Sequence, residues 1–279
     1  MSAPAGSSVK YTADYRHANP AAALGLLWAR REVLWAWIRR EVSVRYRQTF
    51  LGVLWAVLQP LALMIVFSAI FTQVLPVETE GAPYTVFAYT GLLFWSLFAN
   101  AVSYGSQSIV NNLNLVTKVY FPREILPLSA IATSLLDFGF AALVFLGLIA
   151  VYGLGVSWSW LLLPYLLAVE LLLIIGLVLV LAALNVFYRD IRFVVPVGLQ
   201  LLFYATPLVY PLELVPAWLK TLLLLNPLAG LVESARQALL FGRPPPAPYL
   251  LVPTAISVAV FFLGLHWFKR VEMRFADEI

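Results

Sequence analysis

The chain has 279 residues, of which 62% are hydrophobic and 11% are charged, with a formal net charge of +4. Soluble domains carry about 25% charged residues, so this composition excludes a single water-soluble core and predicts an all-α protein that crosses a membrane several times. Cysteine is absent and only two histidines occur, which excludes disulfides and cysteine-based metal sites and argues against a histidine-built one.

Six apolar stretches have nearly the length of about 20 residues that a helix needs to cross a bilayer. The predicted spans cover residues 51–74, 84–106, 126–152, 158–186, 193–210 and 249–268. They form one transmembrane domain over residues 51–270, between a polar N-terminus (1–20), an interfacial segment (21–50) and a short tail (271–279).

The basic residues predict the orientation of these spans. Of 18 lysines and arginines, 15 lie before the first span, in the second-to-third and fourth-to-fifth loops, or after the last span. The first-to-second and third-to-fourth loops contain none. Because basic residues concentrate on the cytoplasmic side of membrane proteins, both termini are predicted to be cytoplasmic.

Residues 21–50 carry apolar side chains at helical spacing and several arginines off that stripe. The stripe consists of Leu24, Trp28, Trp35, Ile38, Val42 and Tyr46. A basic amphipathic helix with tryptophan on its apolar face is typical of the membrane interface. Two roles stay open for this segment, a membrane anchor alone or an anchor that also contacts a partner protein.

The loop between the second and third spans predicts a short helix over about residues 111–121. Asn111, Asn112 and Asn114 suit its start, and Pro122 stops it. Its apolar edge consists of Leu113, Val116, Val119 and Tyr120. Such a helix suits docking into a groove of another protein, although a plain loop is the alternative.

The loop between the fourth and fifth spans contains Tyr188, Arg189 and Asp190, which can form a tight charged turn. That turn is either a second contact with a partner or a simple cytoplasmic anchor.

The connection before the last span contains two apolar runs, neither long enough to cross a membrane. They are separated by Asn226-Pro227, and the second run carries Glu233 and Arg236 three residues apart. Short apolar helices broken by proline and charge are typical of re-entrant or interfacial elements. We therefore expect external re-entrant helices over about residues 214–241, followed by a stiff proline-rich connector.

Two acidic residues, Asp137 and Glu170, lie inside predicted spans, where an ionisable side chain marks a functional site by default. They indicate either proton coupling or a hydrogen-bonded structural role, and no basic partner is evident within the spans. Aromatic side chains on the first and fifth spans are candidates to line a path and stack on sugars, or to pack at the membrane interface. These candidates are Trp55, Phe67, Phe71, Phe203, Tyr204 and Tyr210.

No phosphate-binding loop of the form G-x-x-x-x-G-K-[ST] occurs, so the chain is not expected to hydrolyse ATP. The predicted external loops lack the clustered carboxylates, or the nucleophile next to a base, that an active site requires. We expect neither catalytic residues nor a bound cofactor or metal.

Four segments together resemble the ABC-2 type transporter permeases, in particular the branch that exports lipid-linked polysaccharides such as O-antigen and teichoic acid. These segments are RREVSVRYRQTFLGVLWAVLQPL, LVTKVYFPREILPL, LNVFYRDIRFVVP and NPLAGLVESARQALL. The resemblance implies a half-transporter in the bacterial inner membrane. Two copies would form the pore and two copies of a separate ATPase, which bind ATP and Mg, would lie beneath it.

The resemblance also implies roles for individual segments. Residues 113–121 would be the coupling helix that enters the ATPase, and the turn at Tyr188, Arg189 and Asp190 would be a second contact. The N-terminal helix would also touch the ATPase. The re-entrant pair would form the external gate, with Trp218, Asn226, Glu233 and Arg236 as its residues.

Three alternatives remain at the level of sequence. The same fold could export a drug or a small lipid. An ion-coupled transporter would use Asp137 and Glu170, and a membrane-embedded glycan-processing enzyme would need external acidic clusters.

Overall fold

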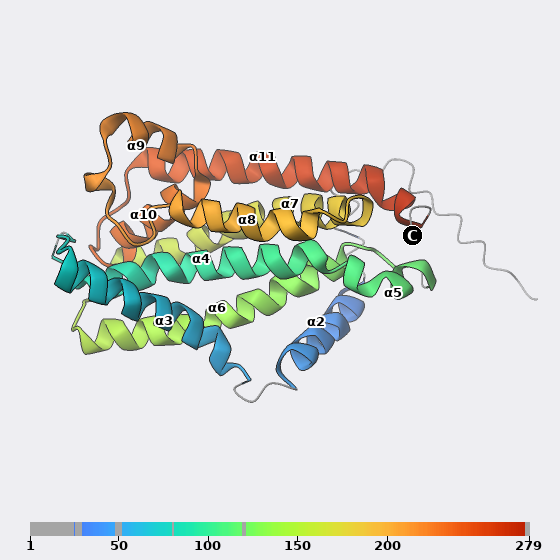
Figure 1. The fold of residues 1–279 in the computed structure, drawn as a ribbon, viewed down its shortest axis with the longest axis horizontal. Helices are drawn as coiled ribbons and strands as arrows, with labels where there is room; N and C mark the ends of the chain where they lie inside the picture. Colours follow the sequence, from blue (N-terminus) through green and yellow to red (C-terminus); the bar gives the residue numbers. More distant parts are fainter. Residues whose placement is uncertain (1–24, 26–29, 48–51, 80, 119–120, 277–279) are drawn as a thin grey trace, which may run out of the picture.

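The computed structural model describes residues 25, 30–47, 52–79, 81–118 and 121–276, which form a helical bundle without strands in those ranges (Figure 1). The long helices are α2 (Arg31–Tyr46), α3 (Leu54–Ala69), α4 (Tyr84–Gln107), α6 (Ile125–Val151), α7 (Leu163–Phe187), α8 (Ile191–Tyr204), α10 (Pro227–Leu239) and α11 (Ala247–Val271). The short elements are η1 (Ile70–Val74), η2 (Val110–Asn112), α5 (Leu113–Lys118), η3 (Trp158–Leu162), η4 (Leu212–Leu214), α9 (Ala217–Leu224) and η5 (Glu272–Ala276).

Among the residues that the structure describes, five helical segments are long and apolar enough to cross a membrane. They are Leu54–Val74, Tyr84–Gln107, Ile125–Val151, Trp158–Phe187 and Ala247–Val271. Each contains 21 to 30 residues, so at about 1.5 Å per residue each can span the hydrocarbon layer of about 30 Å.

The predicted fifth span is shorter than the sequence suggested. The apolar pattern extended to residue 210, but α8 ends at Tyr204 after 14 residues. Pro207 and Pro211 follow closely, and proline disfavours a helix because it lacks an N–H and its ring clashes with the preceding turn. Within the described residues there are therefore five helices of spanning length and one shorter apolar helix, so the predicted count of six spans is not confirmed.

Helix α4 forms the centre of the bundle and packs against α3, α6, α7, α8 and α10. Val86, Ala88 and Phe94 on α4 are completely buried. The two helices α7 and α11 run side by side and approach closely because each contributes a glycine. A Cβ atom on Gly176 would lie 2.4 Å from the carbonyl oxygen of Val260, and small residues of this kind let helix backbones meet in membranes.

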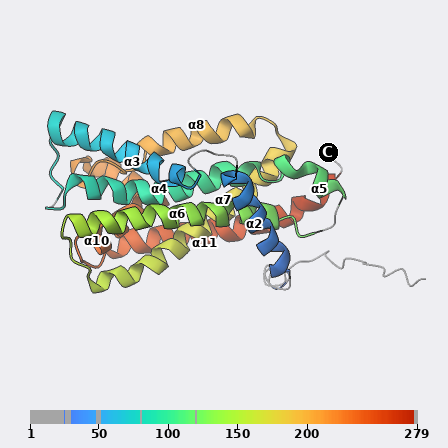
Figure 2. The same cartoon turned by 90° about the horizontal axis from the view of Figure 1, so that it is seen from below.

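Helix α2 lies outside this bundle and packs across α6 (Figure 2). Ile38, Val42 and Tyr46 of the predicted stripe are half-buried, whereas Trp35 is 58% exposed. Leu24 and Trp28 lie outside the described residues. Part of the apolar face of α2 is therefore partly covered, and part of it is exposed.

The loops separate into two groups at opposite ends of the bundle. In Figure 1, α5 and the end of α11 lie at one end, whereas α9, α10 and the turn between α3 and α4 lie at the other. The loops that contain most of the basic residues therefore share one end of the bundle.

Candidate functional site

The short helix predicted over residues 111–121 is present as η2 followed by α5, which ends at Lys118. Leu113 is the first residue of α5 and is half-buried. Val116 lies within α5, but its side chain is outside the described part of the structure, as are Val119 and Tyr120. The helix exists where expected, although the described structure does not test its apolar edge.

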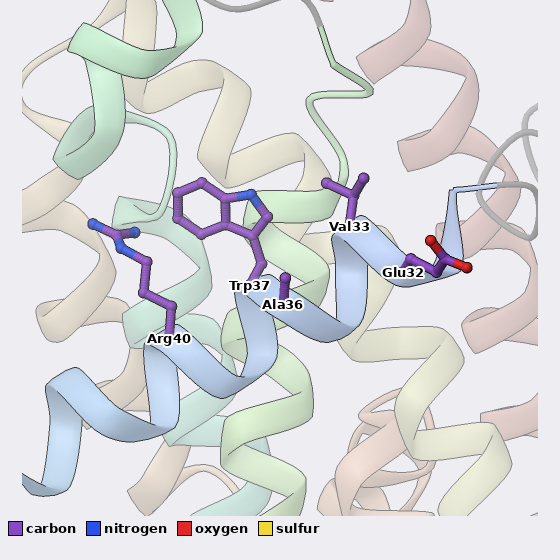
Figure 3. Close-up of a pocket in the computed structure, with 5 residues that line it drawn as sticks. All are labelled: Glu32, Val33, Ala36, Trp37 and Arg40. Carbon is purple, nitrogen blue, oxygen red and sulfur yellow. The ribbon is translucent and has the colours of Figure 1, made fainter.

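Two contacts join α2 to this segment. The Arg40 guanidinium donates a hydrogen bond of 3.1 Å to the Oδ1 atom of Asn112. The rings of Trp37 and Phe121 stack with their centroids 6.3 Å apart. Arg40 also lies over Trp37, with its Cζ atom 4.4 Å from the ring centroid. Because both residues sit on one side of α2, a single helix face holds the loop (Figure 3).

The same face of α2 carries a shallow, mainly apolar recess of about 380 Å³. It is lined by Glu32, Val33, Ala36, Trp37 and Arg40, which Figure 3 shows along consecutive turns of α2. An open apolar recess beside a short helix is the kind of surface into which a partner protein inserts a side chain.

The end of the chain is tied to the same loop. Glu124, the residue before α6, forms an ion pair with the ammonium group of Lys269 on α11, which also lies 3.1 Å from the Oε1 atom of Glu272. Arg123 donates a hydrogen bond to the backbone carbonyl of Glu272. Burial, together with the nearby Glu124 carboxyl, raises the pKa of Glu272 to about 7. Sequence reasoning counted these charges only as orientation signals, because their pairing needs the tertiary fold.

Tyr188, Arg189 and Asp190 form the turn between α7 and α8, and all three are exposed. The carbonyl of Tyr188 accepts a hydrogen bond from the Ile191 N–H at 3.2 Å. The carbonyl of Asp190 accepts bonds from the first turn of α8. These hydrogen bonds of the turn are made within the backbone, so the three side chains can contact solvent or a partner.

The aromatic candidates on α3 and α8 separate into a cluster and one outlier. The ring of Phe67 stacks on Phe71 at 6.3 Å and on Phe203 at 6.1 Å, and Phe203 meets Tyr204 edge to face at 5.4 Å. The hydroxyl of Tyr210 reaches the carbonyl of Tyr204 at 3.4 Å. These rings join α3 to α8 along one flank of the bundle (Figure 2).

Trp55 lies apart from this cluster, near the start of α3, and is 57% exposed. The outer surfaces of α3 and α8 are also exposed and apolar. They carry Leu54, Ile65, Val66, Ile70, Phe193, Val194, Val197 and Leu201. We call this surface the α3–α8 flank.

Asp137 has a basic partner, contrary to the expectation from the spans alone. Its Oδ2 atom lies 2.6 Å from the Arg45 guanidinium, and its Oδ1 atom accepts a hydrogen bond from the Tyr46 hydroxyl. Both partners come from α2, which is why a search within the spans missed them. Glu170 is fully buried, and neither carboxyl oxygen has a hydrogen-bond partner among the described residues.

The residues expected at an external gate occupy different environments. Arg236 is completely buried and donates hydrogen bonds to the carbonyls of Pro207 at 2.8 Å and Leu208 at 2.5 Å. Glu233 lies 3.9 Å from Arg236 on the same helix. Together they hold the segment after α8 against the bundle.

Asn226 caps the start of α10, where its Oδ1 atom accepts the Leu228 N–H at 3.1 Å and its amide donates to Thr206 at 2.9 Å. Trp218 on α9 is 69% exposed. Of the four residues, only Trp218 projects from the surface.

Comparison with known proteins gives a consistent result over almost the whole chain. Residues 32–240 match the family model of the ABC-2 type transporter. The O-antigen export system permease protein RfbA of Myxococcus xanthus is 33% identical over 255 residues, which is 91% of this chain and 97% of that protein. RfbA of Klebsiella pneumoniae is 30% identical over 85% of this chain and 91% of its own length.

A more distant relative is the polysialic acid transport protein KpsM of Escherichia coli, which is 25% identical over 84% of this chain and 91% of its own length. The family model covers more than half of the chain and includes the α2 contact, the α5 segment and the buried α10 arginine. On these grounds the chain belongs to the ABC-2 type transporter family.

Proposed function

We propose that this chain is the membrane permease subunit of an ABC exporter that moves a lipid-linked polysaccharide across the bacterial cytoplasmic membrane. The observation that carries the proposal is the similarity to O-antigen export permeases, which extends over 91% of the chain. A separate ATPase subunit binds ATP and Mg and supplies the energy, since the chain contains no phosphate-binding loop.

The ATPase docks at the end of the bundle that carries η2, α5, the turn at Tyr188–Asp190 and η5. We call this the docking end. Its basic residues favour a cytoplasmic position for this end and for both termini. The recess on α2 and the exposed turn offer the ATPase an apolar and a charged contact at the same end of the bundle.

Movement of the ATPase reaches the membrane through contacts that hold the docking end together. Arg40 and Trp37 link α2 to the α5 segment, and the Glu124–Lys269 ion pair links the start of α6 to α11. A displacement of α5 is therefore passed to several helices. The ATP-bound partner favours an open permease only if it contacts the open and closed states differently.

The glycan passes along the α3–α8 flank, where two copies of this chain face each other. The flank is apolar and carries the cluster formed by Phe67, Phe71 and Phe203 together with Tyr204. Aromatic rings can pack against the apolar faces of sugars without fixing one sequence of residues. Helices α9 and α10, with Trp218, Asn226, Glu233 and Arg236, close the external end of the path.

Depletion of this protein in its host tests the transport function. Lipid-linked glycans are extracted and their side of the membrane is determined with a membrane-impermeant lectin. Accumulation on the cytoplasmic side, with loss of the surface polymer, is the expected outcome, and a plasmid copy should reverse it. A normal surface polymer without accumulation would point to an exporter of a small lipid or drug.

The docking end is tested separately by the double substitution Val116→Asp with Tyr120→Ala. Export should stop while the ATPase of the complex continues to turn over, because the coupling contact is lost. The matched control is Val151→Asp with Tyr152→Ala, which changes the same residue types at the exposed opposite end of α6. Unchanged export in the first double variant would remove α5 from the docking end.

A further inference from the structure

A small polar cavity lies between α2, the start of α3, α4 and α6, away from the aromatic cluster of the α3–α8 flank. Its volume is about 200 Å³. Sites for drug-sized ligands are larger, at about 300–1,000 Å³. The side chains that give it its character are Arg45, Gln59, Asn100, Asp137, Trp55 and Tyr104. Its size restricts an occupant to about one ring.

Two amide side chains in the cavity have unused hydrogen-bonding capacity. Gln59 on α3 and Asn100 on α4 make no hydrogen bond to any residue that the structure describes. Each amide offers two N–H donors and a carbonyl acceptor. Asn100 is half-buried, whereas Gln59 is exposed at the edge of the cavity. A polar side chain within a membrane helix bundle, such as Asn100, is costly and marks a functional site by default. The two amides therefore point to a ligand with both donor and acceptor groups.

The charges in the cavity cancel each other. The Arg45 guanidinium lies 2.6 Å from one carboxyl oxygen of Asp137, and the Tyr46 hydroxyl donates a hydrogen bond to the other. An anion would have to draw Arg45 away and leave the buried Asp137 without its charged partner, which is strongly unfavourable. A neutral, hydroxyl-rich ligand meets no such penalty.

One aromatic ring in the cavity is free to contact such a ligand. The ring of Tyr104 is already covered by Arg45, whose Cζ atom is 3.9 Å from its centroid. Trp55 has no ring partner among the described aromatic residues and is 57% exposed. An indole face beside two amides can hold the apolar face of a sugar while the amides bind its hydroxyls.

We infer that this cavity is a subsite for one neutral sugar ring of the transported glycan, with Trp55 as its platform and Gln59 and Asn100 as hydroxyl-binding residues. The inference rests on the proposed function for the identity of the glycan. The subsite borders α2, and α2 also contacts Asn112 of η2 at the docking end. An occupied cavity would therefore lie next to a helix that we propose to meet the ATPase.

The test uses the complex with its ATPase in lipid nanodiscs. The probes are the neutral monosaccharides obtained by hydrolysing the surface polysaccharide of the host, and binding is measured by saturation-transfer NMR. At least one sugar should bind, and Gln59→Met or Asn100→Leu should weaken it about 3- to 10-fold, the effect of losing one hydrogen bond. Gln73→Met is the matched control, because Gln73 is, like Gln59, an exposed amide on the same helical segment but does not line the cavity.

A second pair of variants tests the ring contact. Trp55→Leu should weaken sugar binding, whereas Trp158→Leu, at an exposed position on η3, should leave it unchanged. The subsite is refuted if no sugar binds, if Gln59→Met and Gln73→Met behave alike, or if inorganic phosphate displaces the bound sugar. In the last case the cavity is an anion site.

The outcome is separable from the depletion experiment. Cytoplasmic accumulation of glycan without sugar binding would keep the export function and remove the subsite. Sugar binding at Trp55 without a glycan phenotype in depleted cells would keep the subsite and remove the export function.

Discussion

The interface between α7 and α11 and the α3–α8 flank are both apolar, yet they are built in opposite ways. At the α7–α11 interface, Gly264 approaches so closely that a Cβ atom there would lie 2.2 Å from the carbonyl oxygen of Gly176. On the flank, large rings fill the gap between helices, and Val195 is the only residue of α8 that is buried. The first interface is complete within one chain, whereas the second exposes most of its apolar surface.

This difference shows that apolar character alone does not decide which helices form the fixed frame. Lipid tails are as apolar as leucine, so burying apolar area gives little reason for two helices to associate in a membrane. Close backbone packing supplies the attraction at α7 and α11. The flank lacks it, so its helices can separate or accept a second copy of the chain.

The largest effect is expected from Gly264→Leu, which disrupts the close packing of α7 against α11. The added side chain meets the backbone of α7, and overpacking of a core costs about 1–3 kcal/mol even where side chains can adjust. We expect little monodisperse protein by size-exclusion chromatography and a strongly lowered melting temperature. Gly139→Leu on α6 is the control, because a Cβ atom there has no neighbour within 4 Å. Equal behaviour of the two variants would contradict the close-packing argument.

A smaller loss is expected when the buried anchor of α10 is removed by Arg236→Met. The carbonyls of Pro207 and Leu208 lose their donor and Glu233 loses its ion-pair partner, so we expect about 1–3 kcal/mol of destabilisation. Thermal unfolding in detergent measures it. Arg270→Met at an exposed position of α11 should change the melting temperature little. A melting temperature of Arg236→Met equal to that of the wild type would remove Arg236 as an anchor.

Much of the fold could be predicted from the sequence, because the positions of the spans depend on local properties. Apolar runs and the alternation of basic loops need no tertiary contacts to be recognised. The exception is α8, whose apolar pattern continues past its end at Tyr204. There the conformational restriction of Pro207 overrides hydropathy, and a count of apolar residues does not register it.

The contacts of individual site residues were harder to predict, since they join segments far apart in the chain. Asp137 is paired by Arg45 from α2, and Glu124 by Lys269 from the end of α11. Both basic residues looked like orientation signals in the sequence. Arg236 was correctly noted beside Glu233, but only the fold reveals that it binds the carbonyls after α8.

The absence of cysteine from the chain allows a direct test of the flank. Leu201→Cys places a single thiol on the exposed face of α8, and Leu251→Cys places one on the exposed face of α11. If two copies face each other along the flank, oxidation in membranes should link Leu201→Cys into a dimer and leave Leu251→Cys monomeric. The free energy of unfolding of both variants should lie within about 0.5 kcal/mol of that of the wild type, as is usual for exposed substitutions. Dimers formed only by Leu251→Cys would place the contact on α11.

The smallest effect is expected at Glu272, where the docking end responds to pH. Burial and the Glu124 carboxyl raise the pKa of Glu272 from 4.5 to about 7, so the folded protein holds this proton more tightly than the unfolded chain. Stability is therefore greatest at the acidic end of this range and falls as the pH rises from 4.5 through about 7. We expect the melting temperature to fall by about 2–4 °C for each kcal/mol lost. Glu272→Gln cannot ionise and should flatten this slope, while Glu32→Gln, at an exposed position of α2, should preserve it. An identical slope in wild type and Glu272→Gln would assign the pH response to another group.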